Sequence, residues 1–103
     1  MAEIIWTEPA LNDLDAIADY IAFDDPAAAR ALVRRIFDHV EQLAAHPDSG
    51  SRPPELKGWS YRQIVESPCR VFYRREGDSV YILHVMRGER RLRSGTLSKR
   101  GKR

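Results

Sequence analysis

Residues 61–85 constrain the fold most, because they contain three runs of strand-forming residues separated by two short breaks. Aromatic and β-branched residues dominate each run, as is typical of strands. The breaks contain Pro68 and Gly77, which interrupt strands and favour turns. The sequence therefore predicts a three-stranded antiparallel meander. Its strands are expected at residues 61–66, 70–75 and 79–85.

The residues before the meander have the pattern of a strand followed by two helices. A short apolar run at residues 3–7 predicts the strand. Apolar residues recur at helical spacing over residues 8–22 and 26–45, which predicts the helices. Asp25 followed by Pro26 marks the second helix start, because a capping carboxylate and a first-turn proline are both favoured there. The short connection predicts an antiparallel helical hairpin.

These elements predict an α+β fold in the order β-α-α-β-β-β, with a helical hairpin packed on one face of the meander. The apolar stripes of the helices must be covered, and the meander offers the only remaining apolar surface. A chain of 103 residues suits one domain. We assign residues 1–93 to this domain and residues 94–103 to a basic C-terminal tail. Its Gly, Ser, Lys and Arg residues predict little burial and high mobility in the absence of a partner.

Charge is distributed unevenly along the chain. Residues 87–103 carry eight lysines and arginines against one acid, whereas residues 1–86 carry nine against fourteen. The cationic end therefore has a net charge of +7 and the remainder a net charge of −5. Such an end favours an anionic partner, either nucleic acid or an acidic protein surface. The alternative is a solvated terminus without a partner.

Four arginines lie on the first two strands of the meander. Arg70 and Arg74 are expected on one face with Phe72 between them, because side chains alternate along a strand. On a face without helices, arginines could bind phosphates or carboxylates bidentately. They could equally pair with nearby carboxylates and contribute to solubility. The four residues are Arg62, Arg70, Arg74 and Arg75.

His84 ends the last strand, beside the cationic segment. An imidazole there could act as a general acid or base. It has no evident orienting carboxylate in the sequence, and it is expected on the same face as Val80 and Ile82, which favours a packed, neutral histidine. His39 and His46 lack metal-ligand spacing, and no phosphate-binding glycine loop is present. We therefore expect no metal and no cofactor.

The apolar runs and the first residues predict where in the cell the protein is located. No apolar run approaches the roughly 20 residues of a membrane-spanning helix. The first residues lack the basic region of a secretory signal. These features predict a cytoplasmic protein without membrane contact.

Six segments have a distinctive order and spacing. One of them, residues 68–74, looks like a "G-Y-R-hydrophobic-hydrophobic-Y" strand. The six segments are residues 10–17, 55–58, 61–62, 68–74, 81–85 and 87–90. Together they resemble the RelE/ParE superfamily of type II toxin–antitoxin toxins over about residues 3–93. The resemblance implies the fold predicted above. It also implies a cognate antitoxin whose C-terminal segment wraps the toxin, and so a hetero-oligomeric complex.

The resemblance implies one of two activities. RelE-like members cleave mRNA on the ribosome and need a proton-transfer group near a cluster of cations, whereas ParE-like members poison DNA gyrase. Lys57 and Arg70 match cationic positions of the ribonuclease site, but Gly88 stands where the ribonuclease has an arginine. No tyrosine or histidine follows His84, and arginine stays protonated, so it cannot readily remove a proton from a 2′-hydroxyl.

The ParE-like branch therefore fits better, and it implies a non-enzymatic poison that binds gyrase in complex with DNA. The alternative is a RelE-like, ribosome-dependent mRNA interferase, with Lys57, Arg70 and His84 as its catalytic residues. For the gyrase poison, the expected target-binding residues are Arg87, Arg90, Arg91 and Arg93. The expected antitoxin-binding residues are Arg62, Arg70 and Arg74.

Overall fold

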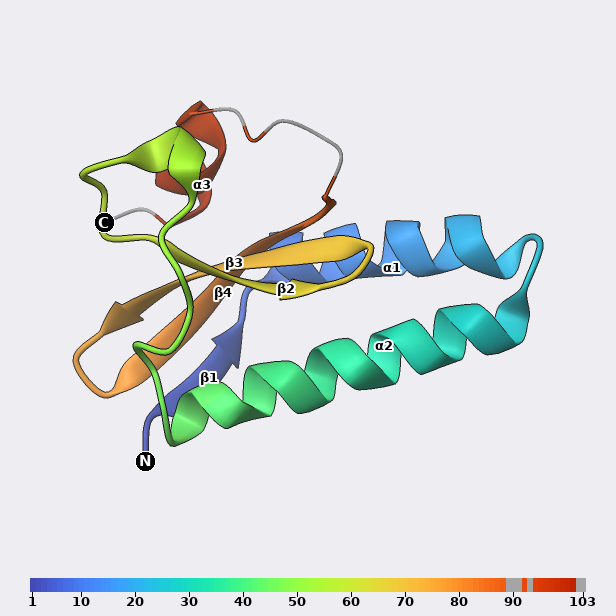
Figure 1. Ribbon diagram of the computed structural model, residues 1–103, viewed down its shortest axis with the longest axis horizontal. Coiled ribbons are helices and arrows are strands. Elements are labelled where there is room, and N and C mark those ends of the chain that lie inside the picture. Colours follow the sequence, from blue (N-terminus) through green and yellow to red (C-terminus); the bar gives the residue numbers. More distant parts are fainter. Residues whose placement is uncertain (89–91, 93, 102–103) are drawn as a thin grey trace.

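A computed structural model describes residues 1–88, 92 and 94–101, and its elements follow the predicted order β-α-α-β-β-β (Figure 1). The strands are β1 (Glu3–Trp6), β2 (Arg62–Glu66), β3 (Cys69–Glu76) and β4 (Ser79–Arg87). The helices are α1 (Glu8–Ala22), α2 (Pro26–Glu41) and α3 (Ser94–Gly101), with short 3-10 helices η1 (Gln42–Ala44) and η2 (Pro54–Leu56). The fold class predicted from the sequence is confirmed, and α3 is an addition to it.

The four strands form one mixed sheet in the order β1-β4-β3-β2. β2, β3 and β4 pair antiparallel, which confirms the predicted meander. β1 pairs parallel with β4, with Ile4 opposite Val80. The last strand in the sequence therefore lies inside the sheet, between the first and the third.

Local sequence signals explain where the two long helices begin. The Thr7 hydroxyl accepts a hydrogen bond from the Ala10 N–H at the start of α1. The Asp25 carboxylate accepts one from the Ala28 N–H (3.0 Å) at the start of α2, as its sequence predicts. Such caps satisfy N–H groups that have no partner within the helix. α2 ends at Glu41, earlier than predicted, and η1 continues its path.

The main core lies between the helical hairpin and one face of the sheet. Figure 1 shows α1 and α2 side by side along the sheet, connected at a turn that extends beyond the strands. Large apolar side chains from both helices and three strands are buried here. They include Leu14, Leu32, Ile36, Val40, Leu43, Ile64, Val71, Tyr73, Val80, Ile82 and Val85.

A second, smaller cluster covers the opposite face of the sheet. η2 and the following turn contribute Leu56 and Tyr61, and α3 contributes Leu97, which is fully buried. The remaining members are Phe72, Leu83, Met86 and Leu92. Leu97 is an exception to the low burial predicted for residues 94–103, because its helical turn directs it onto the sheet, whereas Gly95, Ser98 and Lys99 are exposed. The expected mobility of the tail remains a prediction.

A β-bulge in β4 changes which face His84 occupies. Tyr73 pairs with Ile82 but Phe72 pairs with His84, so Leu83 is the extra residue. The bulge places His84 beside Phe72, with ring centroids 5.8 Å apart. The prediction that His84 shares a face with Ile82 is therefore wrong, because strict alternation does not continue through a bulge.

Among the described residues, no helix is both long and apolar enough to cross a membrane.

Candidate functional site

The candidate site lies along the outer edge of β4, where β1 ends. β1 pairs with β4 only as far as Ile82. The Ile82 carbonyl accepts hydrogen bonds from the Thr7 N–H (3.1 Å) and the Thr7 hydroxyl (2.6 Å). Thr7 therefore closes the parallel ladder and at the same time starts α1.

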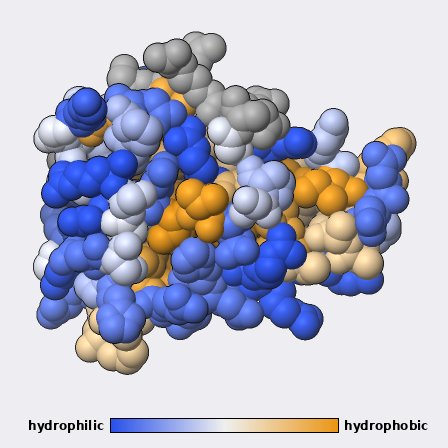
Figure 2. Space-filling model, in the orientation of Figure 1, coloured by the Kyte–Doolittle hydropathy of each residue, from blue (hydrophilic) through white to orange (hydrophobic). Residues whose placement is uncertain are grey.

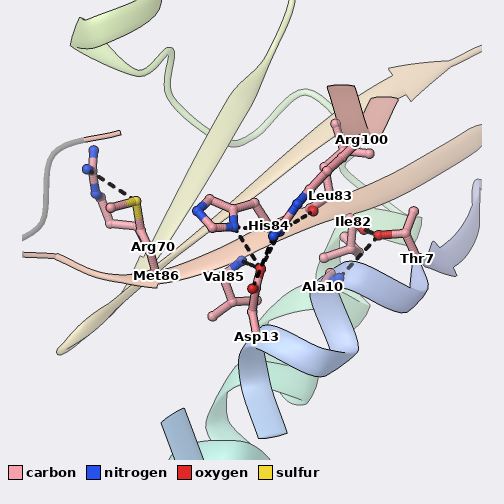
Figure 3. Close-up of polar contacts among 10 residues, drawn as sticks. All are labelled: Thr7, Ala10, Asp13, Arg70, Ile82, Leu83, His84, Val85, Met86 and Arg100. Atoms are coloured by element: carbon pink, nitrogen blue, oxygen red, sulfur yellow. Dashed lines mark hydrogen bonds and ion pairs between the residues drawn. The ribbon is translucent and has the colours of Figure 1, made fainter. Parts of the chain in front are cut away.

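Beyond Ile82, side chains take the place of a neighbouring strand (Figure 3). The Asp13 carboxylate of α1 accepts a hydrogen bond from the Val85 N–H (3.1 Å). The Arg100 guanidinium of α3 donates to the Leu83 carbonyl (3.2 Å). Two helices from opposite ends of the chain thus satisfy backbone groups that an exposed sheet edge would leave open.

Asp13, His84 and Arg100 form one compact charged cluster at this edge. The Asp13 Oδ2 lies 2.7 Å from the His84 Nδ1, and Arg100 binds both carboxylate oxygens of Asp13. The side chains of Asp13 and His84 are only 18% and 14% exposed. His84 therefore does have an orienting carboxylate, contrary to the prediction from sequence, because Asp13 lies 71 residues away along the chain.

Burial and hydrogen bonding act in opposite directions on Asp13. Burial raises the pKa of the Asp13 carboxyl, but the hydrogen bonds from His84, Arg100 and the Val85 N–H outweigh it and lower that pKa. Asp13 is therefore a fixed negative charge at neutral pH.

The protonation of the His84 Nδ1 decides what this cluster can do. A protonated Nδ1 donates to Asp13 and leaves the Nε2 as a base. An unprotonated Nδ1 can instead accept from the Arg100 Nη1, which lies 2.7 Å away, and the Nε2 then carries the proton. One nitrogen cannot serve both neighbours, so only the first arrangement suits proton removal.

A second charged cluster lies on the same face of the sheet and contains Arg70. Its guanidinium donates to both Glu55 carboxylate oxygens (3.2 and 2.9 Å) and to Gln63 (3.2 Å). Glu55 also accepts from the Leu92 N–H (3.4 Å). The hydrogen bonds from Arg70 outweigh the effect of burial and lower the pKa of Glu55 to about 2. The charge of Arg70 is thus balanced within the fold.

The three arginines expected to bind the antitoxin have different neighbours. Arg74 lies 3.4 Å from Glu76, as expected if it pairs with a nearby carboxylate. Arg62 donates to the Gly50 carbonyl (2.8 Å). Arg70 lies over the ring of Phe72, which confirms the predicted arrangement of these two residues on one face.

Of the residues expected to bind the target, only Arg87 falls in the described part of the chain. Its guanidinium lies 5.5 Å from the ring centroid of Tyr20 on α1. The predictions for Arg90, Arg91 and Arg93 lie outside the described residues.

The structure brings together two of the three residues of the nuclease alternative. Arg70 and His84 both contact the ring of Phe72. Lys57 is exposed on the turn after η2.

Sequence reasoning missed Asp13, Arg100 and Glu55 as partners in these clusters. Asp13 carries a usable signal, because it lies three residues after Ala10 and four before Ile17, and so on a partly buried side of α1. Arg100 and Glu55 carry no such signal, because their partners are distant in the sequence. In the described residues, no group of three His, Cys, Asp or Glu side chains could hold a metal ion.

Comparisons with known proteins find relatives with both ParE and RelE names. The family model described as "ParE toxin of type II toxin-antitoxin system, parDE" matches residues 4–92. The chain is 43% identical over 83 residues to the protein Y4kP of Sinorhizobium fredii, which covers 81% of this chain and 84% of that protein. It is 34% identical over 89 residues to toxin RelE2 of Caulobacter vibrioides, covering 84% and 92% of the two chains.

A solved structure titled as the chromosomal ParDE TA system from P. aeruginosa has the same fold. Its TM-score is 0.73 at 29% sequence identity, and the match covers 86% of this chain and 98% of that chain.

Proposed function

Because the chain belongs to the ParE toxin family of type II toxin–antitoxin systems, we propose that it acts as a non-enzymatic poison of DNA gyrase. A cognate antitoxin would neutralise it by wrapping its C-terminal segment around the toxin in a hetero-oligomeric complex. The match to the ParE family model over residues 4–92 carries the proposal.

The contacts and exposure of the cationic residues support gyrase poisoning over RNA cleavage. Arg70, a candidate to stabilise a developing phosphorane charge, donates through both Nη nitrogens to the Glu55 carboxylate (3.2 and 2.9 Å). Lys57 is exposed and lies on a turn. A catalytic site needs its charges held toward the substrate, not neutralised by the protein.

One observation favours the alternative, a ribosome-dependent mRNA interferase. The Asp13 carboxylate lies 2.7 Å from the His84 Nδ1, and a carboxylate in this place can orient a histidine as a general base. The similarity to a toxin named RelE2 points in the same direction.

Induction in cells without the antitoxin separates the two activities. A gyrase poison produces gyrase-linked DNA breaks and an SOS response while transcripts stay intact. Rapid, codon-associated cleavage of transcripts without DNA damage would overturn the proposal.

Substitutions in the two candidate sets test the same point. We expect Arg87→Ala to reduce toxicity more than His84→Ala, since the proposed activity needs no proton transfer. Loss of toxicity in a folded His84→Ala protein, with Arg87→Ala unaffected, would instead favour the nuclease.

A further inference from the structure

Two aromatic side chains at the end of the helical hairpin stand out by their exposure. Phe23 is 90% exposed and Tyr20 is 70% exposed, more than any other aromatic residue among those described. They lie three residues apart, and Phe23 keeps helical backbone angles (φ −55°, ψ −41°), so the two side chains are neighbours on α1. Clustered exposed aromatic groups mark interaction sites more often than single ones do.

The shape of the fold explains why this end is uncovered. The hairpin extends beyond the strands, so no sheet lies under its connection (Figure 1). Ile17, Ile21 and Val33 are consequently only partly buried. Figure 2 shows hydrophobic residues between the helices toward this end, with hydrophilic residues beside them.

An arginine from the sheet lies beside one of the two aromatic residues. The guanidinium of Arg87, at the end of β4, lies 5.5 Å from the ring centroid of Tyr20. Tyrosine and arginine often dominate the energy of protein interfaces, and aromatic residues are enriched in them. We call Tyr20 and Phe23 the hairpin tip, and Arg87 borders it.

The charge around the hairpin tip selects among partners. Asp19, Asp24 and Asp25 are all exposed here and outnumber the Arg87 that borders Tyr20, and the chain has no lysine or arginine before Arg30. Such a surface repels the phosphates of nucleic acid and an acidic antitoxin segment. It fits a cationic protein surface with an apolar pocket.

We propose that the hairpin tip docks on a cationic protein surface of the target enzyme, next to where that enzyme holds DNA. This inference rests on the proposed function, because an enzyme that grips DNA carries basic surface around its DNA-binding groove. The aromatic pair supplies the buried contact, and the aspartates supply charge complementarity.

The test compares a tip variant with a matched control. Tyr20→Ser/Phe23→Ser removes both exposed rings. Val65→Thr changes another exposed apolar residue (52% exposed), which lies on β2 and not on the connection between α1 and α2. Each full-length toxin is released from its antitoxin complex, checked for native circular dichroism, and titrated against purified gyrase with and without DNA and against the antitoxin.

We expect the tip variant to bind gyrase roughly 10- to 100-fold more weakly, while its antitoxin affinity stays within about twofold. The control should match the wild type in both titrations, and the wild-type affinity for gyrase should fall as salt rises.

Three results would overturn the inference. If wild-type toxin inhibits gyrase and the tip variant binds it equally well, the inference fails while the proposed function stands. Loss of antitoxin binding in the tip variant would assign the surface to the antitoxin instead. If the wild type neither binds nor inhibits gyrase, the proposed function fails and the inference fails with it.

Discussion

The two faces of the sheet are covered by very different means. On one face, α1 and α2 bury a continuous apolar cluster that includes Leu14, Ile36 and Val40. On the other face, η2 and α3 bury a smaller cluster, and the ion pairs of Arg70 and Arg100 hold these segments in place.

The two layers should differ in how their stability responds to pH and salt. Burial of apolar area depends little on pH or salt, whereas an ion pair depends on both. We therefore expect the hairpin face to determine global stability and the α3 face to open separately, under milder conditions.

The largest expected effect is at the centre of the hairpin face. Ile36→Ala removes a fully buried side chain and leaves a cavity, so we expect the free energy of unfolding to fall by about 4 kcal/mol. Urea denaturation measures it, with the exposed Arg34→Ala on the same helix as a control that should stay within about 0.5 kcal/mol. A loss below about 1 kcal/mol at Ile36 would contradict the comparison.

A smaller and more local effect is expected for the α3 face. Leu97→Ala should destabilise the packing of α3 by about 2–3 kcal/mol, while the unfolding of the hairpin core changes much less. Hydrogen exchange distinguishes local opening of α3 from unfolding of the hairpin core. In the variant, amides of α3 should exchange faster than in the wild type, while those of α2 keep their protection. The exposed Lys99→Ala is the control. Equal acceleration in both helices would show that the two layers unfold as one.

Acid should act on the α3 face through Glu55. The pKa of Glu55 is about 2 in the folded chain against 4.5 as its ordinary value, so its contribution is complete above pH 4.5 and is lost as the pH falls through 2. We expect Glu55→Gln to lower the free energy of unfolding by about 2 kcal/mol at pH 7. The stability of this variant should also depend less on pH between pH 2 and pH 4.5. Parallel pH dependences for the variant and the wild type would exclude this role for Glu55.

The smallest effect is expected at the edge of β4. Asp13→Asn keeps an oxygen for the Val85 N–H but removes the charge that Arg100 and His84 face. We expect the free energy of unfolding to fall by about 1 kcal/mol. Thermal unfolding measures it, and Asp15→Asn, exposed on the same helix, is the control. A double-mutant cycle with Arg100→Gln should recover most of that loss as coupling energy; additive effects would show that the pair contributes nothing.

The hairpin face is the part of the fold that the sequence predicts well. Its signals are local: the Asp25-Pro26 helix start, and apolar residues at the spacing of a helix or a strand. The α3 face is harder to predict, because Leu97 is a single apolar residue among polar neighbours and shows no periodicity. Its burial depends on Leu56 and Tyr61, which lie far away in the sequence.

The candidate site is predictable only in part for the same reason. A histidine next to cations is visible in the sequence, and so is the meander that carries it. The bulge at Leu83 depends on how β4 pairs with β3, and the contact of His84 with Asp13 forms only when α1 packs beside β4. No short-range pattern encodes either feature.

The place of β4 in the sheet has a consequence for how the protein is made. Among the described strands, β4 is synthesised after the other three, yet it pairs with both β1 and β3. A nascent chain that ends before residue 79 has no partner for β1 and only a two-stranded hairpin from β2 and β3, which is marginally stable in water. The core therefore cannot close until β4 (Ser79–Arg87) has been synthesised, and translation products that end before it should remain unfolded.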